Sequence, residues 1–177
     1  MARGASSNNL FPRYNLCYYN LIMKYFYLTV ALFLFLVEAR ANVELKEFYT
    51  DGCTLFMDNY PKHKEKSWRH CCVIHDLRYW YGGNKSEKDQ TDLDLKACVE
   101  KSYSAFLANL MYRGIRIGNS SPIKHKTHWG WGWVEKKPAY FNLTEEETQY
   151  VKTKFETLDL KEDKVSIPDF INRYLSK

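Results

Sequence analysis

The sequence contains no hydrophobic run long enough to cross a membrane, no internal repeat and no low-complexity segment. Its longest apolar run, residues 25–37, is shorter than the roughly 20 residues that a membrane-spanning helix needs. We therefore expect no transmembrane helix in the mature protein. With 177 residues, 45% of them hydrophobic, the chain is suited to one domain with a substantial core.

A charged residue and a run of small residues flank this apolar segment. Lys24 precedes it, and Ala39-Arg40-Ala41 follows it with small residues at the two positions that signal peptidase recognises. We expect residues 1–41 to be a secretory signal peptide, and residues 42–177 to be a single mature domain in the periplasm or the extracellular space. Because a signal normally begins with its charge, Met23 is the favoured translation start, and an unusually long polar leader is the alternative.

Cysteine is scarce, and its distribution indicates disulfides. Of the five cysteines, Cys17 lies in the expected leader, which leaves Cys53, Cys71, Cys72 and Cys98 in the mature chain. An even number of cysteines in a small exported domain predicts two disulfides, and four cysteines allow three connectivities.

Excess charge of one sign is also lacking. The leader holds four Lys or Arg and one Glu, so the mature chain has 22 basic and 20 acidic residues and a net charge of about +2. This balance argues against nucleic acid as a partner. It is compatible with weak attraction to anionic lipid but does not argue for it.

Two helices are predicted in the middle of the chain, and the fold class is therefore all-α. Residues 68–81 have helical periodicity, and Gly82-Gly83-Asn84 stops the pattern. Ser86, with Asp89 at the capping-box position, predicts a second helix that runs to about Tyr112. Helices joined by so short a turn must lie antiparallel and in contact.

Two further helices are predicted near the C-terminus. Thr144 and Glu147 form a capping box for a helix to about Thr157, and Ser166-Ile167-Pro168 begins a short last helix. Residues 42–67 are expected to form an irregular opening segment.

Acidic residues surround a histidine on the first central helix. His75 and Tyr79 are four residues apart and share a helical face, and Asp92 on the antiparallel helix can lie opposite them. A histidine held by a carboxylate has a fixed tautomer and can act as a general base near neutral pH. Asp76, Asp51 and loop carbonyls are oxygen ligands of the kind that calcium takes. By itself, a His-Asp pair on a helix is most often a surface pair.

The spacing of these residues fits a known pattern, C-C-x-x-H-D-x-x-Y, whose fixed positions are Cys71, Cys72, His75, Asp76 and Tyr79. In this respect the sequence resembles the secreted phospholipase A2 family. In that family an Asp on the antiparallel helix precedes a Cys by six residues, as Asp92 precedes Cys98 here. Residues 50–54, followed by residues 58–59, look like the loop of the small prokaryotic and fungal branch. The resemblance covers about residues 50–98.

The resemblance implies a scaffold and a reaction. The scaffold is a disulfide-linked antiparallel helix pair with irregular loops and extra C-terminal helices, stapled by Cys53–Cys72 and Cys71–Cys98. The reaction is calcium-dependent hydrolysis of the sn-2 ester of a phospholipid at a membrane surface, by a protein that we expect to be a monomer.

The resemblance also implies residue roles. His75 would activate a water, Asp92 would hold the imidazole and Tyr79 would support Asp92. Calcium (Ca²⁺) would be held by Asp51, the carbonyl of Gly52 and Asp76.

Departures from the family keep other interpretations open. Thr54-Leu55-Phe56-Met57 does not resemble the Gly-rich calcium loop of the animal enzymes, and Arg78 stands where many animal members have a further Cys. Asp94 is a second candidate partner for His75, although Asp92 is favoured because Asp94 lies about 200° further round the helix. A lipid-binding or partner-binding exported protein of the same fold, with little or no turnover, is the alternative function.

Two further motifs have competing interpretations. His70, Cys71, Cys72, His75 and Cys53 could form a zinc site, although an exported chain favours disulfides. The alternating Trp129, Trp131 and Trp133 could be an interfacial lip at lipid headgroup depth, or they could be ordinary core that covers the helix pair.

Overall fold

The computed structural model describes residues 22–30, 43–54, 56–60, 63–120 and 127–176. The chain divides into two units, one up to Asn42 and one from Val43 onwards. In the first unit, residues 22–30 form a helix, while most of the predicted signal peptide and its cleavage point after Ala41 lie outside the described residues. No helix in the described part of the chain combines the length and the apolar character needed to cross a bilayer.

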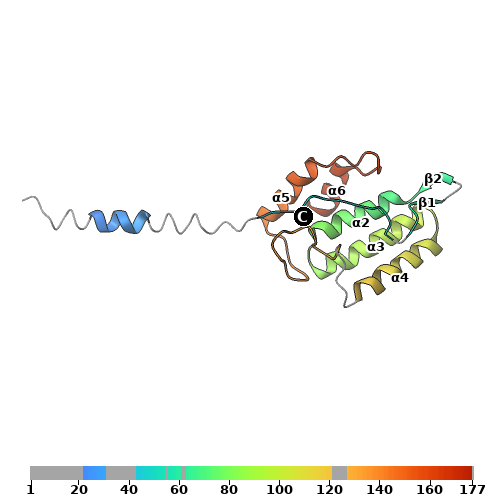
Figure 1. Cartoon of the computed structure of the whole chain (residues 1–177), viewed down its shortest axis with the longest axis horizontal. Helices are drawn as coiled ribbons and strands as arrows, with labels where there is room; N and C mark the ends of the chain where they lie inside the picture. The colour runs from blue at the N-terminus through green and yellow to red at the C-terminus, as the bar shows by residue number, and fades with distance from the viewer. Residues whose placement is uncertain (1–21, 31–42, 55, 61–62, 121–126, 177) are drawn as a thin grey trace, which may run out of the picture. The chain divides into compact units, whose positions relative to one another are not determined.

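The second unit is mostly helical, in agreement with the all-α class, and is organised around the pair α2 and α3 (Figure 1). Helix α2 spans Arg69–Tyr81 and α3 spans Lys85–Ser102. The predicted cap of α3 was wrong. Asn84 is the N-cap, and it exchanges hydrogen bonds with Glu87, because an amide oxygen followed three residues later by Glu satisfies the free N–H groups of the first turn.

The predicted continuous second helix is also wrong, because the chain turns after Ser102. Helix α4 spans Ala105–Ser120, and the N–H of Leu107 donates to the hydroxyl of Ser104, which offers the new helix a local cap. Helix α4 lies beside α3, and Ala108 and Met111 pack in one cluster with Leu95 and Val99 (Figure 1).

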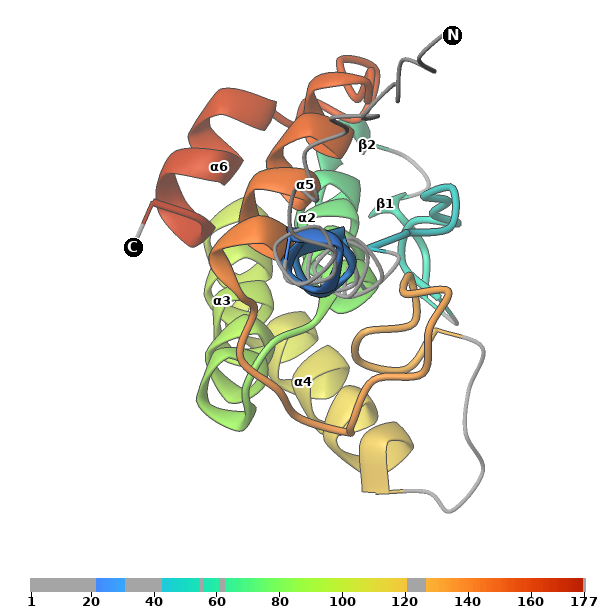
Figure 2. The ribbon, with the colours of Figure 1, turned by 90° about the vertical axis from the view of Figure 1, so that its left-hand side faces the viewer.

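Helices α5 and α6 lie on the other side of α2 from α4 (Figures 1 and 2). Helix α5 spans Glu145–Glu156 and has the predicted capping box of Thr144 and Glu147. Helix α6 spans Ile167–Tyr174 and begins at the predicted cap, Ser166. Phe155 and Phe170 join these two helices to the rings of α2.

A short hairpin precedes α2 and was not predicted. Strand β1, Asn59–Tyr60, pairs antiparallel with β2, His63–Ser67. The hairpin brings Asp58 close to the beginning of α2, because the carbonyl of Asp58 accepts hydrogen bonds from the Ser67 hydroxyl and the Trp68 N–H.

The three tryptophans belong to the core, so the alternative of ordinary core is correct and the exposed lip is wrong. Trp129, Trp131 and Trp133 are between 4% and 6% exposed. The indole N–H of Trp129 donates to the carbonyl of Gly83, and that of Trp133 donates to the carbonyl of Tyr81. The side chains therefore cover the C-terminal end of α2.

The backbone of the same segment supplies further partners for that helix end. The N–H of Gly130 lies 2.7 Å from the carbonyl oxygen of Tyr79, and the N–H of Gly132 lies 2.8 Å from that of Trp80. The last carbonyls of a helix lack partners within the helix, and here residues 129–133 satisfy them. A Cβ at Gly132 would lie 2.6 Å from the Trp80 carbonyl oxygen, so this approach needs glycine.

Candidate active site

His75 and Tyr79 both contact one carboxylate, that of Asp92. The Nε2 of His75 lies 3.1 Å from Oδ1 of Asp92, and the hydroxyl of Tyr79 donates to the same oxygen over 2.7 Å. The His75 and Tyr79 rings lie one helical turn apart, with centroids 4.2 Å from each other. The structure thus brings together the three residues that the resemblance assigns to catalysis, and Asp94 instead contacts Tyr174 and Arg173.

The Asp92 carboxylate is fully buried and has basic neighbours on its second oxygen. The Nζ of Lys88 lies 3.2 Å from Oδ2, and Nη1 of Arg116 lies 3.5 Å from the same atom. Burial alone would raise the pKa of Asp92, but the hydrogen bonds from His75 and Tyr79 and the charges of His75 and Lys88 lower it below its ordinary value. Asp92 is therefore a carboxylate, and it can only accept hydrogen bonds.

This charge state fixes the tautomer of His75. Because the Asp92 carboxylate has no proton to donate, Nε2 of His75 carries the hydrogen in their contact. In the neutral ring Nδ1 is then the unprotonated nitrogen, with a lone pair that can accept a proton. His75 is thus arranged as a general base.

A cavity of about 230 Å³ adjoins this histidine, and we call it the His75 cavity. His75, Asp76 and Tyr79 line one part of it. The rest is mostly apolar and includes Phe56, Leu95, Met111 and Ile115. A base and a carboxylate at the wall of an apolar cavity suit a substrate whose reacting group is polar and whose remainder is hydrocarbon.

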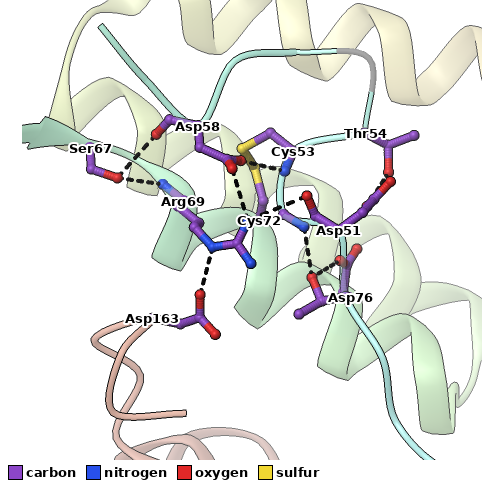
Figure 3. A network of polar contacts seen from close by, with 11 residues as sticks. Asp51, Cys53, Thr54, Asp58, Ser67, Arg69, Cys72, Asp76 and Asp163 are labelled. Atoms are coloured by element: carbon purple, nitrogen blue, oxygen red, sulfur yellow. Dashed lines mark hydrogen bonds and ion pairs between the residues drawn. A yellow bond between two sulfur atoms is a disulfide. The ribbon is translucent and has the colours of Figure 1, made fainter. Parts of the chain in front are cut away.

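The loop before α2 contacts the carboxylate next to the base. The hydroxyl of Thr50 donates to Oδ2 of Asp76 over 2.6 Å and accepts from the N–H of Gly52 over 3.0 Å. The side chain of Asp51 accepts from the Thr54 hydroxyl on the outer side of the loop (Figure 3). Thr50 thus joins Gly52 to Asp76 by hydrogen bonds, and Asp51 is the chain neighbour of Gly52.

Arg69, the first residue of α2, ties this loop to two further carboxylates (Figure 3). Its Nη1 lies 2.8 Å from Oδ2 of Asp58 and 3.3 Å from the carbonyl oxygen of Asp51. Its Nε lies 2.6 Å from Oδ1 of Asp163. Gly52 has φ of +80°, and a Cβ there would lie 2.2 Å from Nη1 of Arg69, so the loop can take this path only with glycine.

The chemistry of the donor set fits a hard divalent cation. Burial raises the pKa of Asp76 to about 6, in spite of the Thr50 hydrogen bond and the His75 charge, and the negative charge of Asp51 contributes to the rise. Two carboxylates that disfavour each other's charge are stabilised by a shared cation, and calcium accepts carboxylate and carbonyl oxygens. Asp51, Asp76 and the Gly52 carbonyl are the groups that would hold it.

The disulfides join Cys53 to Cys72 and Cys71 to Cys98, which is the pairing that the resemblance implies. The zinc interpretation is therefore wrong, because all four sulfurs are in disulfides and none is a thiolate. Among the described His, Cys, Asp and Glu side chains, one group of three has its potential metal-ligand atoms close together, and it consists of His70, Cys71 and Cys98. The two sulfurs of this group are bonded to each other in a disulfide.

Four residues of the site were missed from the sequence. Lys88 is four residues before Asp92, and this spacing usually indicates an exposed ion pair on a helix surface. In the structure both side chains are buried, so the Lys88 charge acts directly on the Asp92 carboxylate. Thr50 had no assigned role, although its hydroxyl next to Asp51 in the sequence was a usable signal. Nothing local marks Arg69 and Asp163 as partners.

No protein-family model matches the chain, and no curated protein or solved structure shows significant similarity to it. A function for the chain is therefore inferred from the geometry of its own residues and from the spacing of its motifs.

Proposed function

We propose that this protein hydrolyses the sn-2 ester of glycerophospholipids in a calcium-dependent reaction, in the manner of a phospholipase A2. The observation that carries the proposal is the pair of contacts at Asp92, in which His75 and Tyr79 share one carboxylate oxygen beside an apolar cavity.

In the proposed reaction, Nδ1 of His75 accepts a proton from a water molecule, and the resulting hydroxide adds to the carbonyl carbon of the ester. The bond from that carbon to the glycerol oxygen then breaks, and the proton on His75 passes to this oxygen. The products are a free fatty acid and a lysophospholipid. Asp92 stabilises the imidazolium that forms between the two proton transfers, and Tyr79 keeps Asp92 in position.

A bound calcium would polarise the ester carbonyl and stabilise the negative charge that develops on its oxygen. Asp51, Gly52 and Asp76 are the residues of this chain that would hold it. Thr50 orients Asp76 for that role through its hydroxyl, and the N–H of Gly52, in its left-handed turn, donates a hydrogen bond to the same hydroxyl.

Helix α4 supports a lipid as substrate. Met111 and Ile115 line the His75 cavity, while Phe106, Leu110 and Ile117 form an apolar stripe on a different side of the same helix and are 80%, 47% and 72% exposed. Residues spaced by three, four and seven positions share a helical face. An exposed apolar stripe on a helix that also lines an apolar cavity is suited to contact with a hydrocarbon layer.

The test is fatty-acid release from vesicles of a phospholipid with different acyl chains at sn-1 and sn-2, with and without a calcium chelator. We expect release of the sn-2 acid alone, loss of release with chelator, and a loss of at least about a hundredfold in His75→Gln. His70→Gln is the matched control, because it removes a histidine of the same helix that does not line the cavity. Release that persists in His75→Gln or with chelator would contradict the proposed mechanism.

A second candidate function is an exported lipid-binding or partner-binding protein of the same fold with no turnover. The observation that favours it is the Arg69 guanidinium, which already supplies the loop with a positive charge 3.3 Å from the Asp51 carbonyl oxygen. A calcium titration followed by thermal unfolding separates the two functions, because an ion that binds the folded chain raises its melting temperature. An unchanged melting temperature at millimolar calcium would favour the binding protein.

A further inference from the structure

A second cavity, of about 520 Å³, adjoins the His75 cavity, and we call it the tryptophan cavity. The two cavities share Gly118 and Thr127 in their linings, so they are neighbours. Trp129, Trp131 and Trp133 form an aromatic wall of the tryptophan cavity. The proposed reaction uses none of these residues.

The lining of this cavity is strongly basic. Within the described part of the chain, it includes four lysines, Lys46, Lys88, Lys136 and Lys137, and one acidic residue, Glu135. A cavity wall with such an excess of positive charge concentrates an anion by direct attraction.

The four lysines differ in what already neutralises them. Lys88 is buried, with a side chain 8% exposed, and contacts the carboxylate of Asp92. Lys137 contacts Glu147 and lies 5.0 Å above the Trp133 ring. Among the residues that the structure describes, Lys46 and Lys136 form no ion pair, so their charges are available to a ligand.

The aromatic wall is fixed in place, which makes the cavity a formed site. The indole N–H groups of Trp129 and Trp133 are committed to backbone carbonyls at the end of α2. The backbone on either side of Trp131 is held at Gly130 and Gly132 by hydrogen bonds to the same helix end. A ligand would therefore meet an ordered wall and would not have to organise it.

We propose that the tryptophan cavity binds the phosphate of the substrate, and that lipids with an anionic headgroup are the preferred substrate class. This inference rests on the proposed function. The chemical character of each cavity lining indicates which part of the substrate it would hold. The sn-2 acyl chain lies in the apolar His75 cavity, and the phosphodiester a few bonds away lies against Lys46 and Lys136 in the neighbouring cavity. The positive charge of these lysines attracts a negatively charged headgroup and raises its affinity, whereas it repels the positive group of a zwitterionic headgroup.

The same lysines could instead hold free inorganic phosphate, and the experiment separates the two sources. Full-length mature protein carrying His75→Gln, which removes turnover, is titrated with glycerol 3-phosphate and with inorganic phosphate while tryptophan fluorescence is recorded. The cavity wall itself reports binding, because three of the five tryptophans lie in it.

We expect saturable binding of glycerol 3-phosphate that is tighter than that of inorganic phosphate. The double variant Lys46→Gln/Lys136→Gln should weaken it about tenfold, as the loss of charge-assisted contacts predicts. Lys101→Gln/Lys161→Gln removes two exposed lysines outside the cavity lining and should leave the affinity unchanged. With His75 intact, hydrolysis of phosphatidylglycerol vesicles should exceed that of phosphatidylcholine vesicles, and the lysine double variant should abolish this preference.

Each other outcome has a distinct meaning. Equal affinity for the two phosphates, with a headgroup preference that the double variant does not alter, would overturn the headgroup assignment. No saturable binding of either phosphate would overturn the cavity as an anion site, whatever the rate of hydrolysis. Lysine-dependent binding in a protein that hydrolyses no lipid would support the anion site and overturn the proposed function.

Discussion

The Nε of Arg69 lies 2.6 Å from Oδ1 of Asp163, so an ion pair joins the beginning of α2 to the turn between α5 and α6. The same guanidinium contacts Asp58 and the carbonyl of Asp51 in the proposed calcium loop. Asp163 thereby orients Arg69, and Arg69 orients the loop, although Asp163 itself contacts no proposed ligand. The turn between α5 and α6 is in this way linked to the proposed metal site through Arg69.

Asp163→Asn should therefore weaken calcium binding without removing a ligand. Outer residues that orient metal ligands typically change metal affinity by about tenfold or more, and we expect a loss of about that size. The measurement is calcium affinity by isothermal titration. Glu162→Gln removes an exposed charge from the same turn and should leave the affinity unchanged. Equal affinities in Asp163→Asn and the unmodified protein would show that the ion pair has no influence on the loop.

Tyr79→Phe isolates the hydrogen bond to Asp92. The variant keeps the ring against His75 and Trp129 and loses only the hydroxyl that donates to Oδ1. A hydrogen bond to a charged, buried group contributes about 1.5–3 kcal/mol, so we expect kcat to fall about tenfold or more while KM changes little. Steady-state kinetics on mixed-chain vesicles measure both constants, with Tyr112→Phe as the control. A rise in KM at constant kcat would assign Tyr79 to substrate binding.

Gly132→Ala tests the close approach between residues 129–133 and α2. The new methyl group would lie 2.3 Å from the Trp80 ring and 2.6 Å from its carbonyl oxygen, and overpacking of this kind costs about 1–3 kcal/mol. Chemical denaturation should therefore show a clear loss of stability. Gly118→Ala is the matched control, because among the described residues no atom beyond the backbone of its own helix and its chain neighbours lies within 4 Å of its added Cβ. Equal stability of the two variants would contradict the observed packing of the segment.

Glu147→Gln tests the anchoring of α5 through a pH dependence. Burial raises the pKa of Glu147, but the Lys137 ammonium and the Thr144 hydrogen bonds outweigh it and hold the pKa below its ordinary value of 4.5. A lowered pKa in the folded state means that the charged glutamate stabilises the fold above that ordinary value, and that this contribution is lost as the pH falls through the folded pKa.

The variant should therefore be less stable than the unmodified protein at pH 7, by about 1–2 kcal/mol for the lost cap and ion pair, and the difference should shrink below about pH 4. Thermal unfolding between pH 3 and pH 8 measures this trend. Glu146→Gln, an exposed neighbour in the same helical turn, should show no comparable pH-dependent loss. A difference that stays constant across this range would exclude a charge effect at Glu147.

The parts of the site that could be predicted from the sequence are those fixed by spacing along helices. His75 and Tyr79 share a helical face because they are four residues apart, and the short turn at residues 82–84 folds α3 back so that Asp92 faces them. The caps of α5 and α6 were equally local. The cap of α3 was misplaced by two residues, because Asn84 with Glu87 and Ser86 with Asp89 both offer a capping pair and only one can begin the helix.

The rest depends on contacts between distant segments. Arg69 and Asp163 are 94 residues apart in sequence, and Trp133 and Tyr81 are 52 apart, so no local pattern could pair them. The end of α3 at Ser102 has no glycine or proline to mark it, and the helical pattern continues into α4. Burial decided the role of the tryptophans, because an alternation of Trp and Gly is compatible with either an exposed lip or a covered helix end.

Cys71 and Cys72 are consecutive residues of α2, yet their sulfurs bond in different directions, one to α3 and the other to the loop that begins the proposed calcium site. A newly made chain in a reducing cytoplasm has neither bond, so the loop and the Asp92 helix would each lack a covalent link to the helix that carries His75. Oxidation of these two neighbouring thiols would then fix both the loop of the proposed calcium site and the helix that carries Asp92 to the same point of α2. Under the proposed function, an exported chain would become an active hydrolase only after it had crossed the membrane, and the cell that makes it would be protected from it until then.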